Sequence, residues 1–221
     1  YAILIPVYAF LFILARTALS GDYTRFLART AKIQARLLVC VYCLSHAPAL
    51  MYLDLDKDPT QHDPTANARL LFYFVLIVQL CDAMQYLSSK LFGRRPLAPT
   101  ISPNKTLEGL IGGVGATTLI GTALWWATPF QVQQAALMSL LLGLMGSCGG
   151  VVMSAIKRDR GVKDYGTLVE GHSGVLDRID SLCFAAPVCY HLSWLFMHAL
   201  KTKTDINGVA PFWEPFTRLF S

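Results

Sequence analysis

Six long apolar stretches, separated by short charged segments, constrain the fold of this 221-residue chain more than any other feature. They lie near residues 1–19, 36–53, 69–89, 107–128, 133–156 and 175–199. A helix needs roughly 20 apolar residues to cross the hydrocarbon layer, and no stretch shows the alternation of a barrel strand. Because lipid forces a backbone to satisfy its own hydrogen bonds, the sequence predicts an all-α, polytopic integral membrane helical bundle with about six transmembrane helices.

The composition supports this class. Hydrophobic residues make up 54% of the chain and charged residues 15%, which is too apolar for an ordinary soluble domain. No internal repeat or linker divides the sequence, so we expect a single domain over residues 1–221, with an N-terminus truncated before Tyr1. The net charge of +5 is not accompanied by a basic soluble domain, which excludes nucleic acid as the expected partner. The six cysteines lack zinc-ligand spacing and are expected to pack as small hydrophobes.

The distribution of Lys and Arg predicts the orientation, because cytoplasmic loops carry the excess of these residues. One set of alternate loops holds 13 of them: Arg16, Arg25, Arg29, Lys32, Arg36, Lys90, Arg94, Arg95, Lys105, Lys157, Arg158, Arg160 and Lys163. The other set holds 5: Lys57, Arg69, Lys201, Lys203 and Arg218. Residues 20–35, 90–106 and 157–174 are therefore predicted to face the cytoplasm.

Two cytoplasm-side clusters precede the fifth stretch. Asp82 lies within the third apolar stretch, where an ionisable group is costly and so a functional candidate; pairing with a neighbouring helix is the alternative. In "SPNKTLEG", Ser102 suits a turn and Thr106 suits the start of a helix. Lys105 beside that helix start could form an anion site, although a lone interfacial lysine is more often a topology signal.

The third cluster runs from Ser154 to Ser181. It begins with basic residues, Lys157, Arg158, Arg160 and Lys163, and continues with Asp164, "EGHSG" and the sixth apolar stretch. A solvated basic loop would explain these lysines and arginines. His172 could carry a proton or orient the loop, and the glycines beside it, Gly171 and Gly174, allow a ligand to approach the backbone.

A solvated loop does not explain the two carboxylates at the start of the last stretch. Asp177 and Asp180 are spaced i, i+3 and so project from one helix face, where they would repel one another without a cation. Oxygen-only ligands favour Mg²⁺, which completes its shell with water and substrate phosphate. Arg178 could hold a phosphate bidentately. The cluster therefore predicts a magnesium-dependent site for a phosphate-rich substrate at the membrane surface.

These motifs resemble the phosphatidate cytidylyltransferase family, also called CDP-diacylglycerol synthases, over about residues 69–199. The family signature S-x-x-K-R-x4-K-D, followed by H-G-G-x-x-D-R-x-D, is matched by Ser154, Lys157, Arg158, Lys163, Asp164, His172, Gly174, Asp177, Arg178 and Asp180. Its upstream element SPxKTxEGxxGG is matched by Ser102, Pro103, Lys105, Thr106, Glu108, Gly109, Gly112 and Gly113. Asp82 and Tyr86 match a D-x-x-x-Y segment.

The resemblance implies that phosphatidate attacks the α-phosphorus of CTP, giving CDP-diacylglycerol and pyrophosphate in phospholipid biosynthesis. It implies catalytic roles for Lys163, Asp164, His172 and Arg178, and cation ligands at Asp82, Asp164, Asp177 and Asp180. Substrate would be bound by Ser102, Lys105, Thr106, Ser154, Lys157, Arg158, Lys163 and Arg178. Family members also suggest a second cation beside Mg²⁺ and a homodimer. We expect contact with membrane lipids and, from the Lys and Arg distribution, a site on the cytoplasmic face of the cytoplasmic (inner) membrane.

Two departures from the family pattern leave other hypotheses open. Ser173 replaces the first glycine after His172, and Gln85 replaces a small residue beside Asp82. The chain could therefore be a catalytically reduced binder of CTP or lipid phosphate with the same fold. A CDP-alcohol phosphatidyltransferase is disfavoured because its motif is absent, and a transporter because paired inverted halves are absent.

Overall fold

The computed structural model describes residues 4–19, 26–55, 65–99, 101–159, 161 and 175–205. The N-terminal part contains α1 (Leu4–Leu19) and one helical run formed by α2 (Phe26–Leu37), a π-helical segment (Leu38–Cys43), α3 (Leu44–Ala49) and a 3₁₀ turn (Leu50–Tyr52). Then follow α4 (Ala66–Phe92), β1 (Pro96–Ala98), β2 (Ser102–Thr106), α5 (Leu107–Ala123), a 3₁₀ turn (Trp125–Ala127), α6 (Val132–Asp159) and α7 (Val175–Asp205).

Within the described residues, four helical spans are long and apolar enough to cross a membrane: Phe26–Tyr52, Ala66–Phe92, Val132–Asp159 and Ile179–His198. Two shorter apolar helices, Pro6–Leu19 and Leu107–Ala123, complete the set. Each of the six predicted stretches thus coincides with a helix. The prediction of an all-α helical bundle with about six apolar helices is confirmed, and the chain is a multi-pass membrane protein.

Two connecting segments contain structure that the sequence did not predict. Residues 26–35, predicted as part of a loop, belong to α2, whose basic residues Arg29, Lys32 and Arg36 recur at helical spacing. The segment 90–106 holds an antiparallel hairpin in which Pro96 pairs with Thr106 and Ala98 pairs with Ser102. Apolarity locates membrane segments but carries no information on regular structure outside them.

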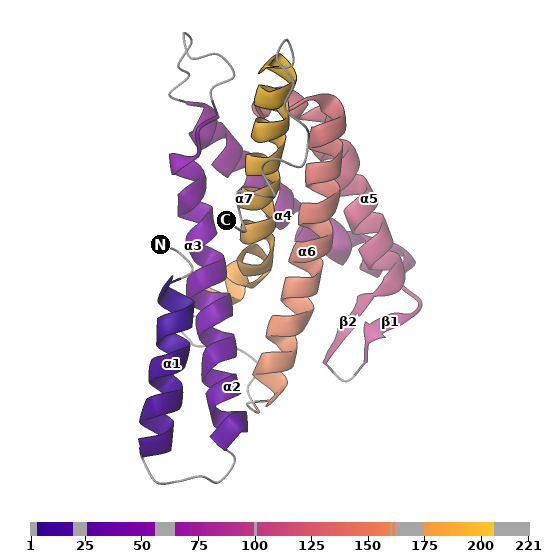
Figure 1. Cartoon of the computed structure of the whole chain (residues 1–221). Coiled ribbons are helices and arrows are strands. Elements are labelled where there is room, and N and C mark those ends of the chain that lie inside the picture. Colours follow the sequence, from indigo (N-terminus) through magenta and orange to yellow (C-terminus); the bar gives the residue numbers. More distant parts are fainter. Residues whose placement is uncertain are drawn as a thin grey trace.

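Helices α4 to α7 form the main bundle, and α1 to α3 lie along one side of it (Figure 1). The most extensive contacts join α4 to α5, α6 to α7 and α5 to α6, while α3 packs against α7. The β1–β2 hairpin projects from the bundle near the C-terminal end of α6 (Figure 1). This places the C-terminal ends of α4 and α6 and the N-terminal starts of α5 and α7 near one another.

Small residues allow these helices to approach closely, as is usual inside membranes. A Cβ atom on Gly113 of α5 would meet the Gln85 backbone of α4, and one on Gly121 would lie 2.5 Å from the Ser139 Cβ of α6. The buried Tyr73 hydroxyl donates to the carbonyl oxygens of Gly121 (3.1 Å) and Ala135 (3.4 Å). One phenol of α4 therefore bonds both neighbouring helices.

All six cysteines are free, and Cys81, Cys183 and Cys189 are buried. Their expected role as small packing residues is consistent with this placement.

Replacing Gly113 by alanine should destabilise the protein, because the new methyl group would overlap the α4 backbone. Overpacking costs about 1–3 kcal/mol. Gly115→Ala is the matched control, since no described atom lies within 4 Å of the position that its Cβ would take. Thermal unfolding in detergent should show a lower midpoint for Gly113→Ala alone. Equal midpoints for both variants would contradict the α4–α5 packing described above.

Candidate active site

A pocket of about 300 Å³ lies where α4, the hairpin, α5, α6 and α7 meet. Its polar side chains come from each of these regions except α5: Asp82, Gln85, Ser89, Ser102, Lys105, Thr106, Ser154, Asp180 and Ser181. Tyr86, Leu97, Leu110 and Gly150 complete the lining. Residues separated by almost 100 positions in the chain therefore share one cavity.

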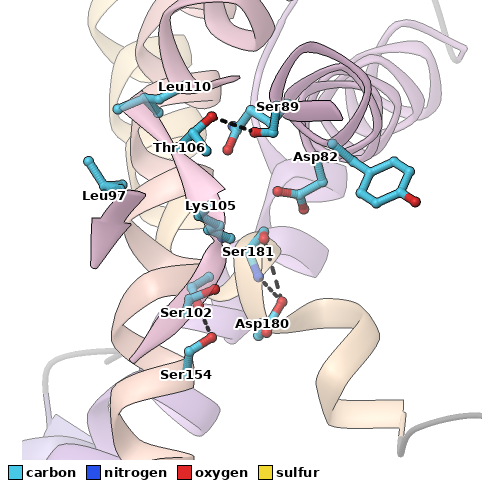
Figure 2. A pocket seen from close by; sticks show the side chains of 13 residues that line it. Asp82, Ser89, Leu97, Ser102, Lys105, Thr106, Leu110, Ser154, Asp180 and Ser181 are labelled. Atoms are coloured by element: carbon cyan, nitrogen blue, oxygen red, sulfur yellow. Dashed lines mark hydrogen bonds between the residues drawn. The ribbon is translucent and has the colours of Figure 1, made fainter. Parts of the chain in front are cut away.

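Two carboxylates from different helices lie in this pocket (Figure 2). Asp180 of α7 accepts a hydrogen bond at Oδ1 from the Ser181 backbone amide (2.8 Å), and its Oδ2 lies 3.7 Å from the Lys157 ammonium of α6. These side chains are only 15% and 11% exposed. The Asp82 carboxylate of α4 lies close to Ser181 and interacts electrostatically with Lys105 and Asp180. Each carboxylate thus has an ammonium group nearby, Lys157 for Asp180 and Lys105 for Asp82.

Lys105 reaches the pocket because α6 has a glycine opposite it. A Cβ atom on Gly150 would lie 2.5 Å from the Lys105 Nζ and 3.3 Å from the Ser181 Oγ. Ser154, one turn further along α6, donates its hydroxyl proton to the Gly150 carbonyl at 2.6 Å. The lysine ammonium therefore lies against the α6 backbone, on the side where the Ser181 hydroxyl also approaches Gly150.

The start of α5 holds the hairpin in place. Thr106 is the N-cap residue: its Oγ1 accepts a hydrogen bond from the Gly109 amide (3.1 Å) and donates to the Ser89 Oγ (3.0 Å). The Glu108 carboxylate accepts from the backbone amides of Arg94 and Arg95, both at 3.1 Å. The predicted helix start at Thr106 is confirmed, and the cap fixes the strand that carries Lys105.

The glycines of the SPxKTxEGxxGG element allow α5 to lie close to α4. Cβ atoms on Gly109 and Gly112 would meet the side chains of Ser89 and Ser88, respectively. The motif therefore combines a lysine that reaches the pocket with glycines that permit close helix packing.

The structure brings together six of the residues singled out from the sequence: Asp82, Ser102, Lys105, Thr106, Ser154 and Asp180. Lys157 adjoins them through its ion pair with Asp180. Arg158 does not line the pocket; its Nε donates to the Ile101 carbonyl at 3.4 Å, in the hairpin turn. Lys163, Asp164, His172 and Ser173 lie outside the described residues, as do the side chains of Asp177 and Arg178.

Several lining residues were missed as site residues although helical spacing could have revealed them. Gln85 and Ser89 follow Asp82 at i+3 and i+7 and therefore occupy its face of α4. Gly150 precedes Ser154 by four residues and shares its face of α6. Leu97 carried no such signal, because its place in the pocket depends on the pairing of the hairpin strands.

Among the described residues, no three His, Cys, Asp or Glu side chains form a group that could hold a metal ion. The acidic donors in the pocket are the two carboxylates Asp82 and Asp180, with hydroxyl oxygens around them. This all-oxygen donor set fits a hard cation that takes its remaining ligands from water and phosphate, as Mg²⁺ commonly does.

Comparison with known proteins places this chain in a family. The sequence model of the cytidylyltransferase family matches residues 1–196. The chain therefore belongs to the cytidylyltransferase family, in agreement with the resemblance inferred from its motifs.

Individual relatives agree with this assignment. The chain is 43% identical over 199 residues to the uncharacterized protein YnbB of Escherichia coli (strain K12), a match that covers 86% of the chain and 62% of YnbB. It is 42% identical over 120 residues to the phosphatidate cytidylyltransferase of Staphylococcus aureus (strain COL), a match that covers 53% of the chain and 46% of that relative. The identity to the phosphatidate cytidylyltransferase of Bacillus subtilis (strain 168) is 38% over 128 residues, which cover 57% of the chain and 48% of that relative. The chain thus spans about half to three-fifths of the length of these relatives.

Thr106→Ala should remove both the α5 cap and the bond to α4, and so lower the free energy of unfolding by about 1 kcal/mol or more. Thr122→Ala is the matched control, because the Thr122 hydroxyl donates to the Thr118 carbonyl of its own helix. Denaturant unfolding in detergent measures both variants. A loss at Thr106 no larger than that at Thr122 would mean that the cap does not anchor the hairpin.

Proposed function

We propose that the protein is a membrane nucleotidyltransferase that converts CTP and phosphatidate to CDP-diacylglycerol and pyrophosphate in phospholipid biosynthesis. The observation that carries this proposal is the pocket in which Asp82, Lys105, Ser154 and Asp180 meet at the ends of apolar helices. Such a pocket offers cationic and hydroxyl groups to phosphates from within a membrane protein. Family membership and the names of the Staphylococcus and Bacillus relatives support the same reaction.

The proposed reaction exchanges one phosphorus–oxygen bond for another. A phosphate oxygen of phosphatidate forms a bond to the α-phosphorus of CTP, while the bond from that phosphorus to the oxygen bridging it to the β-phosphorus breaks. Pyrophosphate leaves with the bonding electron pair. Catalysis of this kind of transfer depends mainly on positioning and on neutralising charge.

The residues of the pocket suit those two tasks. Lys105, and Lys157 beside the pocket, supply positive charge for phosphate oxygens, and the Ser102 hydroxyl can donate a hydrogen bond to them. The Ser154 hydroxyl, which donates to the Gly150 carbonyl, keeps its oxygen lone pairs toward the same substrate region as an acceptor. Asp82 and Asp180 would hold Mg²⁺. When bound, the cation would neutralise phosphate charge and orient the α-phosphorus.

The remaining roles implied by the family signature belong to the same proposal. Asp164 and Asp177 would add carboxylates to the cation site and so provide ligands for a second cation. Lys163 and Arg178 would bind phosphate. His172 would take part in catalysis. We further propose that the protein lies in the cytoplasmic membrane with the pocket on the cytoplasmic side, as the Lys and Arg distribution indicates. A homodimer is the expected assembly.

Asp180→Asn should lower the rate of pyrophosphate release from CTP and phosphatidate by about 100-fold or more, because it removes a charged cation ligand. Asp159→Asn is the control: this aspartate is 53% exposed and forms an ion pair with Lys32 at 2.9 Å, and it does not line the pocket. Turnover of purified full-length protein in mixed micelles provides the measurement. Wild-type turnover no greater than that of Asp180→Asn would refute the enzymatic proposal, and CTP binding without turnover would identify a non-catalytic binder.

Chelation should abolish turnover and added Mg²⁺ should restore it, because the proposed donor set contains only oxygen atoms. The measurement is pyrophosphate release in EDTA, followed by titration with Mg²⁺ or Zn²⁺. Full activity in EDTA, or restoration by Zn²⁺ alone, would contradict the assignment of Asp82 and Asp180 to Mg²⁺.

A further inference from the structure

The pocket lining includes three side chains with apolar surface that the chemistry of phosphate and cation does not require. They are Tyr86 of α4, Leu97 of β1 and Leu110 of α5. In Figure 2, Leu97 and Leu110 lie on the hairpin side of the pocket, whereas Asp180 comes from α7. A site for nucleotide and cation alone gains little from leucine side chains at this position.

Exposure separates the mouth of the pocket from its interior. Tyr86 is 69% exposed and Leu97 is 38% exposed, although both line the cavity. The Asp180 side chain, by contrast, is only 15% exposed. The cavity therefore has an apolar mouth and a charged interior.

The mouth lies near the C-terminal end of the membrane-spanning α4, where the chain continues into the charged segment before the hairpin. Leu91 and Phe92, at the end of α4, are exposed apolar residues, as expected for a lipid-facing helix. Arg94 and Arg95 follow after Gly93 and are exposed at the base of the hairpin that carries Leu97. Tyrosine is favoured at such boundaries because its ring is apolar and its hydroxyl is polar.

We propose that Tyr86 and Leu97 form a threshold that contacts the glycerol backbone and first acyl methylenes of phosphatidate while its phosphate lies in the charged interior. The inference rests on the proposed function, which supplies the lipid substrate. A lipid phosphate is charged at one end and apolar at the other, and the pocket has the same polarity from interior to mouth. CTP has no acyl segment to place against the threshold. The two residues therefore determine affinity for the lipid and not for the nucleotide.

The test is steady-state turnover of the full-length protein in mixed micelles, with phosphatidate and CTP varied separately. Leu97→Ser and Tyr86→Ser should each raise the KM for dioleoyl phosphatidate roughly tenfold, the effect of losing a few buried methylene contacts. The KM for CTP should stay unchanged, and Leu97→Met should retain the wild-type KM for both substrates. Leu91→Ser is the matched control, because Leu91 is 64% exposed and does not line the pocket.

The results separate this inference from the proposed function. If the wild type turns over and both serine variants keep the wild-type KM for phosphatidate, the threshold is wrong while the enzyme assignment stands. An equal rise in the KM for CTP, or the same lipid effect in Leu91→Ser, also overturns the threshold. If the wild type does not turn over at all, both proposals fail. CTP binding measured by calorimetry shows that each variant is folded.

Discussion

The structure depends on how charged side chains are accommodated between apolar helices. A carboxylate removed from water is stable only beside compensating charge or hydrogen-bond donors. Asp180 has the Lys157 ammonium and the Ser181 amide within reach, and Asp82 has Lys105 nearby. Because these partners come from α6, α7 and the hairpin, the same requirement brings together the elements that line the pocket.

Close helix approach makes this compensation possible. Lys105 lies on a strand outside the bundle, and its ammonium meets the pocket only because Gly150 leaves the α6 backbone open to it. Gly109 and Gly113 act similarly for the α4–α5 contact, which sets the position of the α5 cap and thus of the strand. The SPxKTxEGxxGG element is therefore one structural unit. Its glycines allow the close helix packing that positions the Lys105 ammonium.

The sequence predicted the helices and most of the described polar site, for different reasons. Helices follow from apolar length, a local property, and Asp82, Lys105 and Asp180 stand out as charges beside apolar runs. The hairpin and the place of Leu97 depend on pairing across residues 96–106, and the exclusion of Arg158 from the pocket depends on its bond to Ile101. Such tertiary contacts leave no periodicity in the sequence.

Gln85 shows how the structure changes the interpretation of a departure from the family pattern. A long polar residue beside Asp82 could block the pocket or leave an unsatisfied amide. Instead, the buried Gln85 amide donates to the Ser147 hydroxyl of α6 and lies 3.1 Å from the Cys81 Sγ, while Gly113 leaves room for its side chain and backbone. Ser147 in turn donates to the Gly143 carbonyl. A paired amide joins α4 to α6, and Gln85 also lines the pocket, so this departure from the family pattern is accommodated by packing and leaves no unsatisfied amide nitrogen.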